Sequence, residues 1–225
     1  MSRLRTFLAG LALAVALPAA ADAAVVTVRD NPGNGSSVFA TGLGRSVTIR
    51  HNGVNRTVGA GVFSLQYGTG GDWTDILTFC LELSARLTLP KDHERIAGEA
   101  YFPNAVDRQA LGILYGNFMT ADYGLKNADT GAAMQILIWE IIEDGAANFD
   151  LDGGAFKILT SSVRSEALTL WSLLTSGDFK PVRFDVLAAR GTQDLIVSEV
   201  PLPGALTLFG TALAAGAMRR RPRKS

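Results

Sequence analysis

The chain has 225 residues, 48% of them hydrophobic, and its 21 basic and 21 acidic residues give a formal net charge of zero. The charge is uneven, because residues 24 to 200 keep 14 of the basic and 20 of the acidic residues and are therefore near −6. This negative balance argues against nucleic acid or anionic lipid as a partner of the central part. Its roughly 177 residues suffice for one domain with its own core, or for two small packed lobes.

The first 23 residues have the three-part pattern of a secretory signal peptide. Arg3 and Arg5 precede an apolar run from Phe7 to Leu17, which small residues follow up to Ala23. The apolar run is too short for a comfortable membrane span. We therefore predict export, with cleavage after Ala23 by signal peptidase, and leave residues 1–23 out of the fold.

Strand-like patterns occupy the chain from Ala24 to Leu89. Apolar and polar residues alternate in VVTVRD, SVTIRH, GVFSLQYG and ILTFCLELSARLTL, and Gly, Asn and Asp turns separate these segments. This pattern predicts an antiparallel β-sandwich or small barrel. The last segment contains Cys80, the only cysteine of the chain. Because exported proteins usually pair their cysteines, Cys80 is either a buried, inert hydrophobic residue or a reactive group.

From Asn104 onward the apolar residues recur with the spacing of a helix. We predict a helix from Asn104 to Met119 with Val106 on its apolar face, and a second from a cap at Asp129 or Thr130 to Gly145. A third is predicted from Ser161 or Ser162 to near Gly177, before two final strands in PVRFDVLAA and QDLIVSEV. The expected ectodomain, residues 24–199, is thus an α+β fold, a β-lobe with a helical insertion at about 104–177.

The second predicted helix contains a polar residue among apolar ones, Gln135 in MQILIWEII. A buried side-chain amide without a partner costs about 1–3 kcal/mol, so this residue needs one. One explanation is a hydrogen-bonded core glutamine. The other is chemical, because a cysteine thiol that displaces ammonia from a glutamine side chain forms a thioester, which reacts with amines.

The two motifs together resemble the thioester domains of bacterial surface adhesins. Phe79-Cys80-Leu81 is similar to the cysteine motif of that family, and the segment Met134 to Trp139 is similar to its glutamine motif on a helix. The resemblance covers roughly residues 58 to 198. It implies that Cys80 and Gln135 form the thioester, and that an amine-bearing surface or matrix ligand is captured in a single event, so that the protein is not an enzyme.

Several neighbouring residues have expected roles. Trp139 lies one helical turn beyond Gln135 on the same face, so with Phe79 it is expected to shield the bond from water, although plain core packing explains it too. Glu82 and Glu140 are candidates to accept a proton from the attacking amine, or are ordinary exposed carboxylates.

Other candidate sites are weaker. The loop NFDLDGG, residues 148–154, starts like a calcium loop, but Leu159 stands where a bidentate glutamate is required, which favours a turn. His51 and His93 have no metal-like spacing, and nothing orients His93 toward Cys80 as in a thiol protease. We expect no metal and no cofactor.

The C-terminal 26 residues, 200–225, predict a membrane anchor. The segment from Val200 to Met218 carries no charge and is followed at once by basic residues, which favours a transmembrane helix over a buried C-terminal helix. The basic tail consists of Arg219, Arg220, Arg221, Arg223 and Lys224.

This end of the chain resembles the PEP-CTERM sorting signal in its VPLPA variety. The motif reads Val200, Pro201, Leu202, Pro203 and Gly204, with glycine where the variety usually has alanine. The resemblance implies an exosortase as processing enzyme, and a precursor that is tethered to the inner membrane before it reaches the envelope surface or the extracellular matrix. Two functions remain open: a surface protein that captures amines covalently for adhesion or matrix cross-linking, and a non-covalent structural protein of the exopolysaccharide or biofilm matrix.

Overall fold

A computed structural model describes residues 24 to 198. The predicted signal peptide, the sorting motif, the transmembrane helix and the basic tail lie outside these residues. Within residues 24 to 198, no helix combines the length and the apolar character that a membrane crossing requires.

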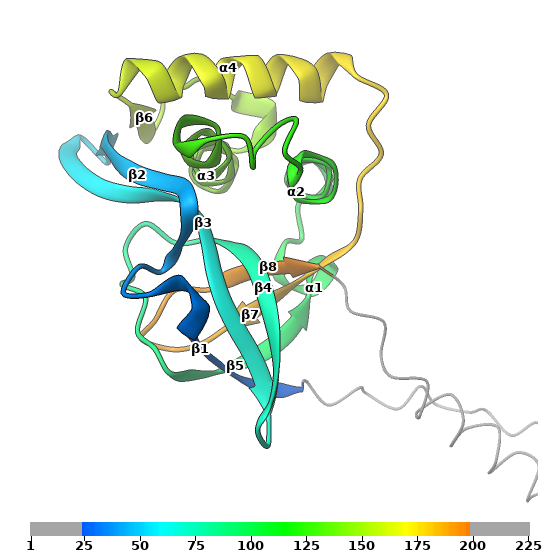
Figure 1. Ribbon diagram of the computed structural model, residues 1–225. Helices are drawn as coiled ribbons and strands as arrows, with labels where there is room; N and C mark the ends of the chain where they lie inside the picture. The colour runs from blue at the N-terminus through cyan, green and yellow to red at the C-terminus, as the bar shows by residue number, and fades with distance from the viewer. Residues whose placement is uncertain (1–23, 199–225) are drawn as a thin grey trace, which may run out of the picture.

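Six antiparallel strands close a β-barrel, because β1 pairs with β5 on one side and with β3 on the other. Figure 1 shows this barrel below the helices. Its interior is hydrophobic, with Val28 and Leu65 fully buried. Around the barrel the strands follow the order β1 (Val25–Asp30), β5 (Lys91–Ala97), β7 (Phe184–Ala188), β8 (Leu195–Ser198), β4 (Asp72–Cys80) and β3 (Val54–Thr69).

A long hairpin extends the sheet beyond the barrel toward the helices (Figure 1). The strand β2 (Phe39–His51) pairs with the first part of β3 and, at its other edge, with the short strand β6 (Phe156–Ile158). Asn52 and Gly53 connect β2 to β3 with φ values of 50° and 81°. Asn-Gly is favoured in two-residue hairpin turns because both central residues need positive φ.

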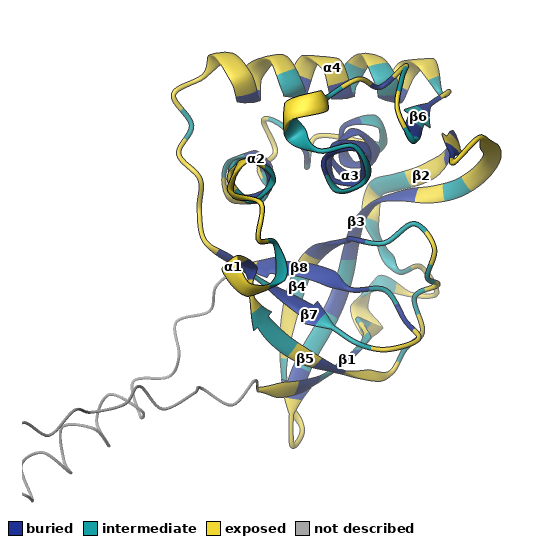
Figure 2. Ribbon diagram, turned by 180° about the vertical axis from the view of Figure 1, so that it is seen from behind, coloured by how far each residue is buried: buried dark blue, intermediate teal, exposed yellow. Residues whose placement is uncertain are grey.

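Four α-helices lie between β5 and β7 in the chain: α1 (Gly98–Tyr101), α2 (Ala105–Phe118), α3 (Ala128–Glu143) and α4 (Ser161–Ser176). The described chain also has 3-10 turns at Pro32–Asn34 and Ala146–Asn148. Helix α3 packs against β2, β3, α2 and α4, and it is buried around its circumference (Figure 2). The apolar sequence of α3 therefore reflects its central position rather than one buried face.

The α+β class and the barrel lobe agree with the sequence-based expectation, but several details of the prediction were wrong. Helix α3 begins at a capping box formed by Asn127 and Thr130 rather than at a cap on Asp129 or Thr130. The strand around Cys80 ends at that residue, and β5 was not predicted. Val106, expected on the apolar face of its helix, is exposed. Helix α4 begins at Ser161 and ends before Gly177, as predicted.

Candidate functional site

Cys80 and Gln135, 55 positions apart in sequence, lie side by side in the structure. Cys80 is the last residue of β4, where the strand pairs with Leu195 of β8. Gln135 lies in the middle of α3, which crosses this end of the strand. Both side chains are buried, with exposed fractions of 2% and 1%. The structure thus brings together the two residues that the motifs singled out.

Three contacts join the pair. The Cys80 backbone N–H donates to Oε1 of Gln135 at 3.2 Å, and Nε2 of Gln135 donates to the Cys80 carbonyl oxygen at 2.7 Å. The Cys80 thiol also lies 3.5 Å from Oε1 of Gln135. The amide group is therefore held in one orientation at the end of β4, with the sulfur next to its acyl oxygen.

Trp139 lies beside the Cys80 thiol, on the same face of α3 as Gln135. It lies four residues after Gln135, which is the spacing of neighbours on a helix surface, and it is 2% exposed. Its indole Nε1 is buried and makes no hydrogen bond of standard geometry. The indole is nevertheless close enough to the Cys80 thiol to lower its pKa. The structure thus places the indole N–H donor beside the sulfur.

Phe79 is also fully buried, within the hydrophobic core. Because neighbouring side chains of a strand point to opposite faces, Phe79 and Cys80 lie on different faces of β4. The alternation favours core packing for Phe79, and its expected role as a shield stays a prediction.

The thiol is electrostatically unusual. Burial raises the pKa of Cys80 to about 12, because the low-dielectric interior disfavours the thiolate, while the Trp139 indole opposes this effect. The carboxylate of Glu82 raises this pKa further. At neutral pH the Cys80 sulfur is therefore protonated and does not behave as a free thiolate nucleophile.

A groove of about 680 Å³ leads to the site. Its walls are the start of β3 at residues 56–59 and the loop at residues 82–87 between β4 and β5, with Gln193 beside them. Trp139 also lines the groove, although it is almost fully covered. The groove therefore reaches Trp139, which lies beside the Cys80 thiol.

The two candidate carboxylates lie in different places. Glu82 lines the groove and accepts the Asp194 N–H at 3.2 Å; burial and the Asp194 carboxylate raise the pKa of Glu82. Glu140 lies five residues after Gln135, about 140° around the helix, so it faces away from the pair. It accepts the Asp150 N–H at 2.8 Å, and its Oε2 has no partner. Of the two, only Glu82 is placed to receive a proton from a group in the groove.

The weaker candidates have structural explanations. The ring nitrogens of His93 face the carbonyl oxygens of Lys91 and Gln193, so the ring is not oriented toward Cys80. His51 contacts Glu143 at 2.9 Å. In the loop after α3, Asp150 accepts the Asp152 N–H in a local turn. Residues 24 to 198 contain no group of three or more His, Cys, Asp or Glu side chains arranged to hold a metal ion.

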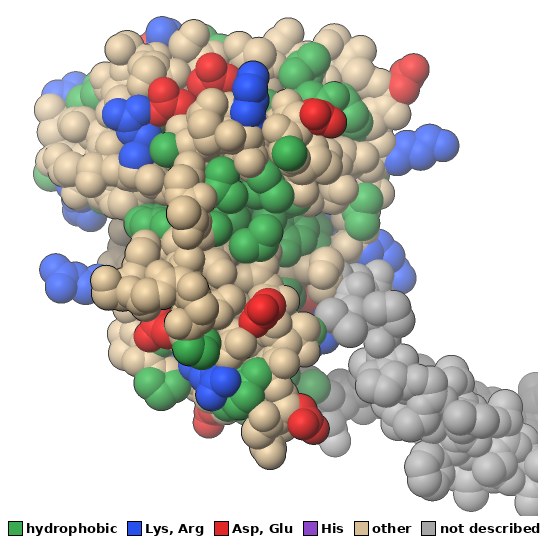
Figure 3. Space-filling view, viewed as in Figure 1, with side chains coloured by type: hydrophobic (Ala, Val, Ile, Leu, Met, Phe, Trp, Pro, Cys, Tyr) green, Lys and Arg blue, Asp and Glu red, His purple; other side chains and the backbone are tan. Residues whose placement is uncertain are grey.

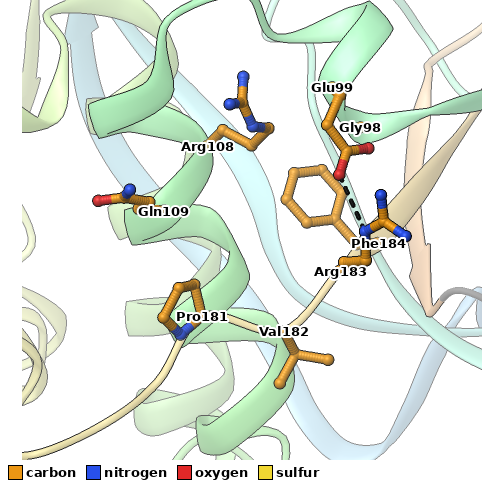
Figure 4. A pocket seen from close by; sticks show the side chains of 8 residues that line it. All are labelled: Gly98, Glu99, Arg108, Gln109, Pro181, Val182, Arg183 and Phe184. Carbon is orange, nitrogen blue, oxygen red and sulfur yellow. Dashed lines mark hydrogen bonds and ion pairs between the residues drawn. The ribbon is translucent and has the colours of Figure 1, made fainter.

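Other hollows lie apart from the pair. One of about 210 Å³ lies between α1, α2 and the segment before β7, where Glu99 and Arg183 form an ion pair (Figure 4). Another of about 340 Å³ is lined by Leu77, Tyr115 and Met119 between β4 and α2. Hydrophobic side chains gather at the level where the helices meet the barrel (Figure 3). Neither hollow is lined by Cys80, Gln135 or Trp139.

Comparison with known proteins found no match to this chain among family models, curated proteins or solved structures. The groove itself was missed by sequence reasoning. Arg56 and Arg86 lie in its walls, but both stand in polar stretches without a motif.

Proposed function

We propose that this protein is an exported surface protein that carries an internal thioester between Cys80 and Gln135 and captures an amine of a partner covalently. The observation that carries the proposal is the buried contact between the only cysteine of the chain and a glutamine amide fixed by two hydrogen bonds to the cysteine backbone. The proposed roles are adhesion or cross-linking of the extracellular matrix.

Formation of the bond is a balanced exchange. The Cys80 sulfur attacks the side-chain carbonyl carbon of Gln135, the C–N bond breaks, and the thiol proton leaves with the amide nitrogen as ammonia. The Cys80 N–H that now binds Oε1 is placed to stabilise the negative charge that develops on this oxygen. The Nε2 hydrogen bond to the Cys80 carbonyl is lost with the ammonia.

In the capture step the Cys80 sulfur is the leaving group instead of the attacking group. A primary amine attacks the same carbon, an amide bond forms, and the Cys80 sulfur leaves and takes up a proton that the amine gives up. The Trp139 N–H lies beside this leaving sulfur. Because burial keeps the pKa of the thiol near 12, the released sulfur remains protonated and does not attack the new amide. The reaction consumes the reactive bond, so the protein acts once.

Position in the cell is part of the same proposal. The predicted signal peptide and the PEP-CTERM-like end would place residues 24–199 outside the inner membrane, with an exosortase processing the VPLPG motif. A protein that reacts once is suited to permanent attachment, which fits a location at the envelope surface or in the extracellular matrix.

One observation favours the alternative, a non-covalent structural protein of the matrix. Both polar atoms of the Gln135 amide are satisfied by the Cys80 backbone, so the buried glutamine needs no chemistry to be stable. In that case the two hydrogen bonds of the pair only hold α3 against the end of β4.

Methylamine distinguishes the two functions. If the thioester exists, methylamine adds to the purified protein, the adduct maps to Gln135, and one thiol becomes available to alkylation after denaturation. Cys80→Ala serves as the control, because it removes the sulfur and leaves the backbone contacts of the pair in place. An unmodified Gln135 and an already free thiol in the wild-type protein would leave only the non-covalent function.

A further inference from the structure

The groove beside Trp139 has an unusual charge pattern. Arg56 on β3 and Arg86 on the β4–β5 loop both line it. Within residues 24 to 198 neither side chain takes part in a hydrogen bond, an ion pair or a ring contact. Most other arginines of this range are engaged, for example Arg45 with Asp129 and Arg95 with Asp185. The central part of the chain is net negative, so two unengaged arginines in one groove form a local positive site.

Arginine pairs of this kind bind carboxylates. The planar guanidinium presents parallel N–H donors that match the two oxygens of a carboxylate, and this pairing is stronger than a neutral hydrogen bond. Glu82 adds one negative charge to the groove, close enough to Cys80 to influence the pKa of that thiol. The groove therefore offers a negative group near the reactive pair and positive groups along its walls.

Because Cys80 and Gln135 are deeply buried, only an amine on a slender chain can reach the Gln135 carbonyl carbon. Cys80 and Gln135 are 2% or less exposed and do not line the groove, whereas Trp139, beside the Cys80 thiol, does. An amine attached directly to a bulky ring does not reach so deep a carbon, whereas the lysine ammonium sits on a slender four-carbon stem. The geometry therefore favours the side chain of a lysine.

The groove also faces away from the ends of the described chain. The Ala24 and Ser198 carbonyl oxygens both accept hydrogen bonds from Arg95, so these two ends lie together. The loop between β4 and β5 lies at the opposite side of the barrel in both views (Figures 1 and 2). A macromolecule can therefore approach the groove from the side of the barrel opposite to residues 24 and 198.

We propose that this groove is the entrance to the reactive pair and that it selects a lysine flanked by acidic residues on a protein partner. Arg56 and Arg86 bind the flanking carboxylates, Glu82 attracts the lysine ammonium, and Trp139 moves aside to admit the stem. The inference rests on the proposed thioester and adds the sequence context of the amine that it captures.

The test compares adduct formation by peptides with one lysine and two residues on each side, either all glutamate or all glutamine. Each rate is divided by the methylamine rate of the same protein, so that damage to the reactive pair cancels. At low ionic strength we expect the acidic peptide to react about tenfold faster, because both exposed arginines attract its carboxylates. The preference should shrink as salt screens the charges.

Two variants complete the test. Arg56→Glu combined with Arg86→Glu should abolish or reverse the preference for the acidic peptide. Lys126→Glu combined with Lys180→Glu makes the same change in net charge at exposed positions outside the groove, and it should retain the preference.

Four outcomes would overturn the inference. Equal rates for the two peptides, or a preference that survives the double arginine variant, would remove the groove as the selective element while methylamine capture still supports the thioester. A faster reaction with an amine-bearing acidic polysaccharide than with the acidic peptide would contradict a protein partner. Failure of methylamine itself to add would instead contradict the proposed function, and the groove inference would fall with it.

Discussion

At the scale of single residues, the indole N–H of Trp139 offers a test that separates the proposed thioester chemistry from simple packing. Phenylalanine keeps an aromatic ring at this position but removes the donor beside the Cys80 sulfur. If the N–H stabilises the leaving sulfur, Trp139→Phe should slow methylamine capture by about 10- to 100-fold, because losing one preorganised donor has effects of this size or larger. Trp73→Phe is the matched control. Equal capture rates for wild type and Trp139→Phe would show that the indole only packs.

The buried carboxyl group of Glu140 leads to a prediction about how the stability of the protein depends on pH. Burial, ahead of the nearby Asp144 and Asp150 carboxylates, raises the pKa of Glu140 from 4.5 to about 7. The folded protein therefore favours the protonated acid, so its contribution is fully present below about pH 4.5 and is lost as the pH rises through 7. We expect the free energy of unfolding to fall by on the order of 2 kcal/mol across this window.

The variant Glu140→Gln should remove this dependence on pH. Glutamine keeps an oxygen for the Asp150 N–H and adds a donor where Oε2 now has no partner. Urea unfolding between pH 5 and 8 measures the difference, with the surface variant Glu166→Gln as control. If Glu140→Gln shows the same slope as wild type, the buried carboxylate is not the source of the effect.

The sequence predicted the proximity of Cys80 and Gln135, whose chemical roles stay predictions, but it did not predict the arginines of the groove. A single cysteine in a chain predicted to be exported and a glutamine in an apolar helix each require an explanation, so their proximity was predictable. Arg56 and Arg86 carry no such signal, because exposed arginines are ordinary. Glu140 was expected as an exposed carboxylate near the pair, but helix geometry turns it away and α3 is buried on every side.

At the scale of elements, the position of α3 depends on a close backbone contact. A side chain at Gly131 would begin 2.3 Å from the Leu43 carbonyl oxygen of β2. An alanine in a helix normally stabilises by about 1 kcal/mol relative to glycine. Here we expect the opposite sign, because overpacking against backbone costs about 1–3 kcal/mol.

The same substitution tests whether the docking of α3 positions the pair. Gly131 lies four residues before Gln135 on the same face of α3, so Gly131→Ala should lower both the free energy of unfolding and the rate of methylamine capture. Ser165→Ala, an exposed change on α4, controls for the effect of helix propensity. A Gly131→Ala protein more stable than wild type would mean that α3 does not depend on this contact.

Element boundaries were harder to predict than element types. The strand around Cys80 stops at that residue, although the alternation of apolar and polar residues continues through the following segment and the Leu81 N–H still bonds to the Asp194 carbonyl, the next partner in the same register. The predicted N-cap of α3, at Asp129 or Thr130, lies two or three residues after the observed one. The observed N-cap is Asn127, whose side chain accepts the N–H groups of Asp129 and Thr130. At α3 a local side-chain bond, rather than the hydrophobic period, therefore sets the end of the element.

At the scale of the whole molecule, the α+β class was predictable and the closure of the sheet was not. Alternating segments and Gly-rich turns indicate antiparallel strands, but they do not distinguish a sandwich from a barrel. The barrel closes through the pairing of β1 with both β5 and β3, which joins segments about 40 to 70 residues apart. The same closure brings β8 beside β4 and so fixes the strand end on which Cys80 lies.

The mass of the intact, exported protein, with both ends established by peptide mapping, tests the central claim most directly. The proposed Cys80–Gln135 thioester predicts a wild-type mass lower by one ammonia than the sequence requires, and a Cys80→Ala protein with the full mass of its own sequence. A wild-type mass equal to that of the unmodified sequence would contradict the thioester and leave Cys80 and Gln135 as a hydrogen-bonded pair.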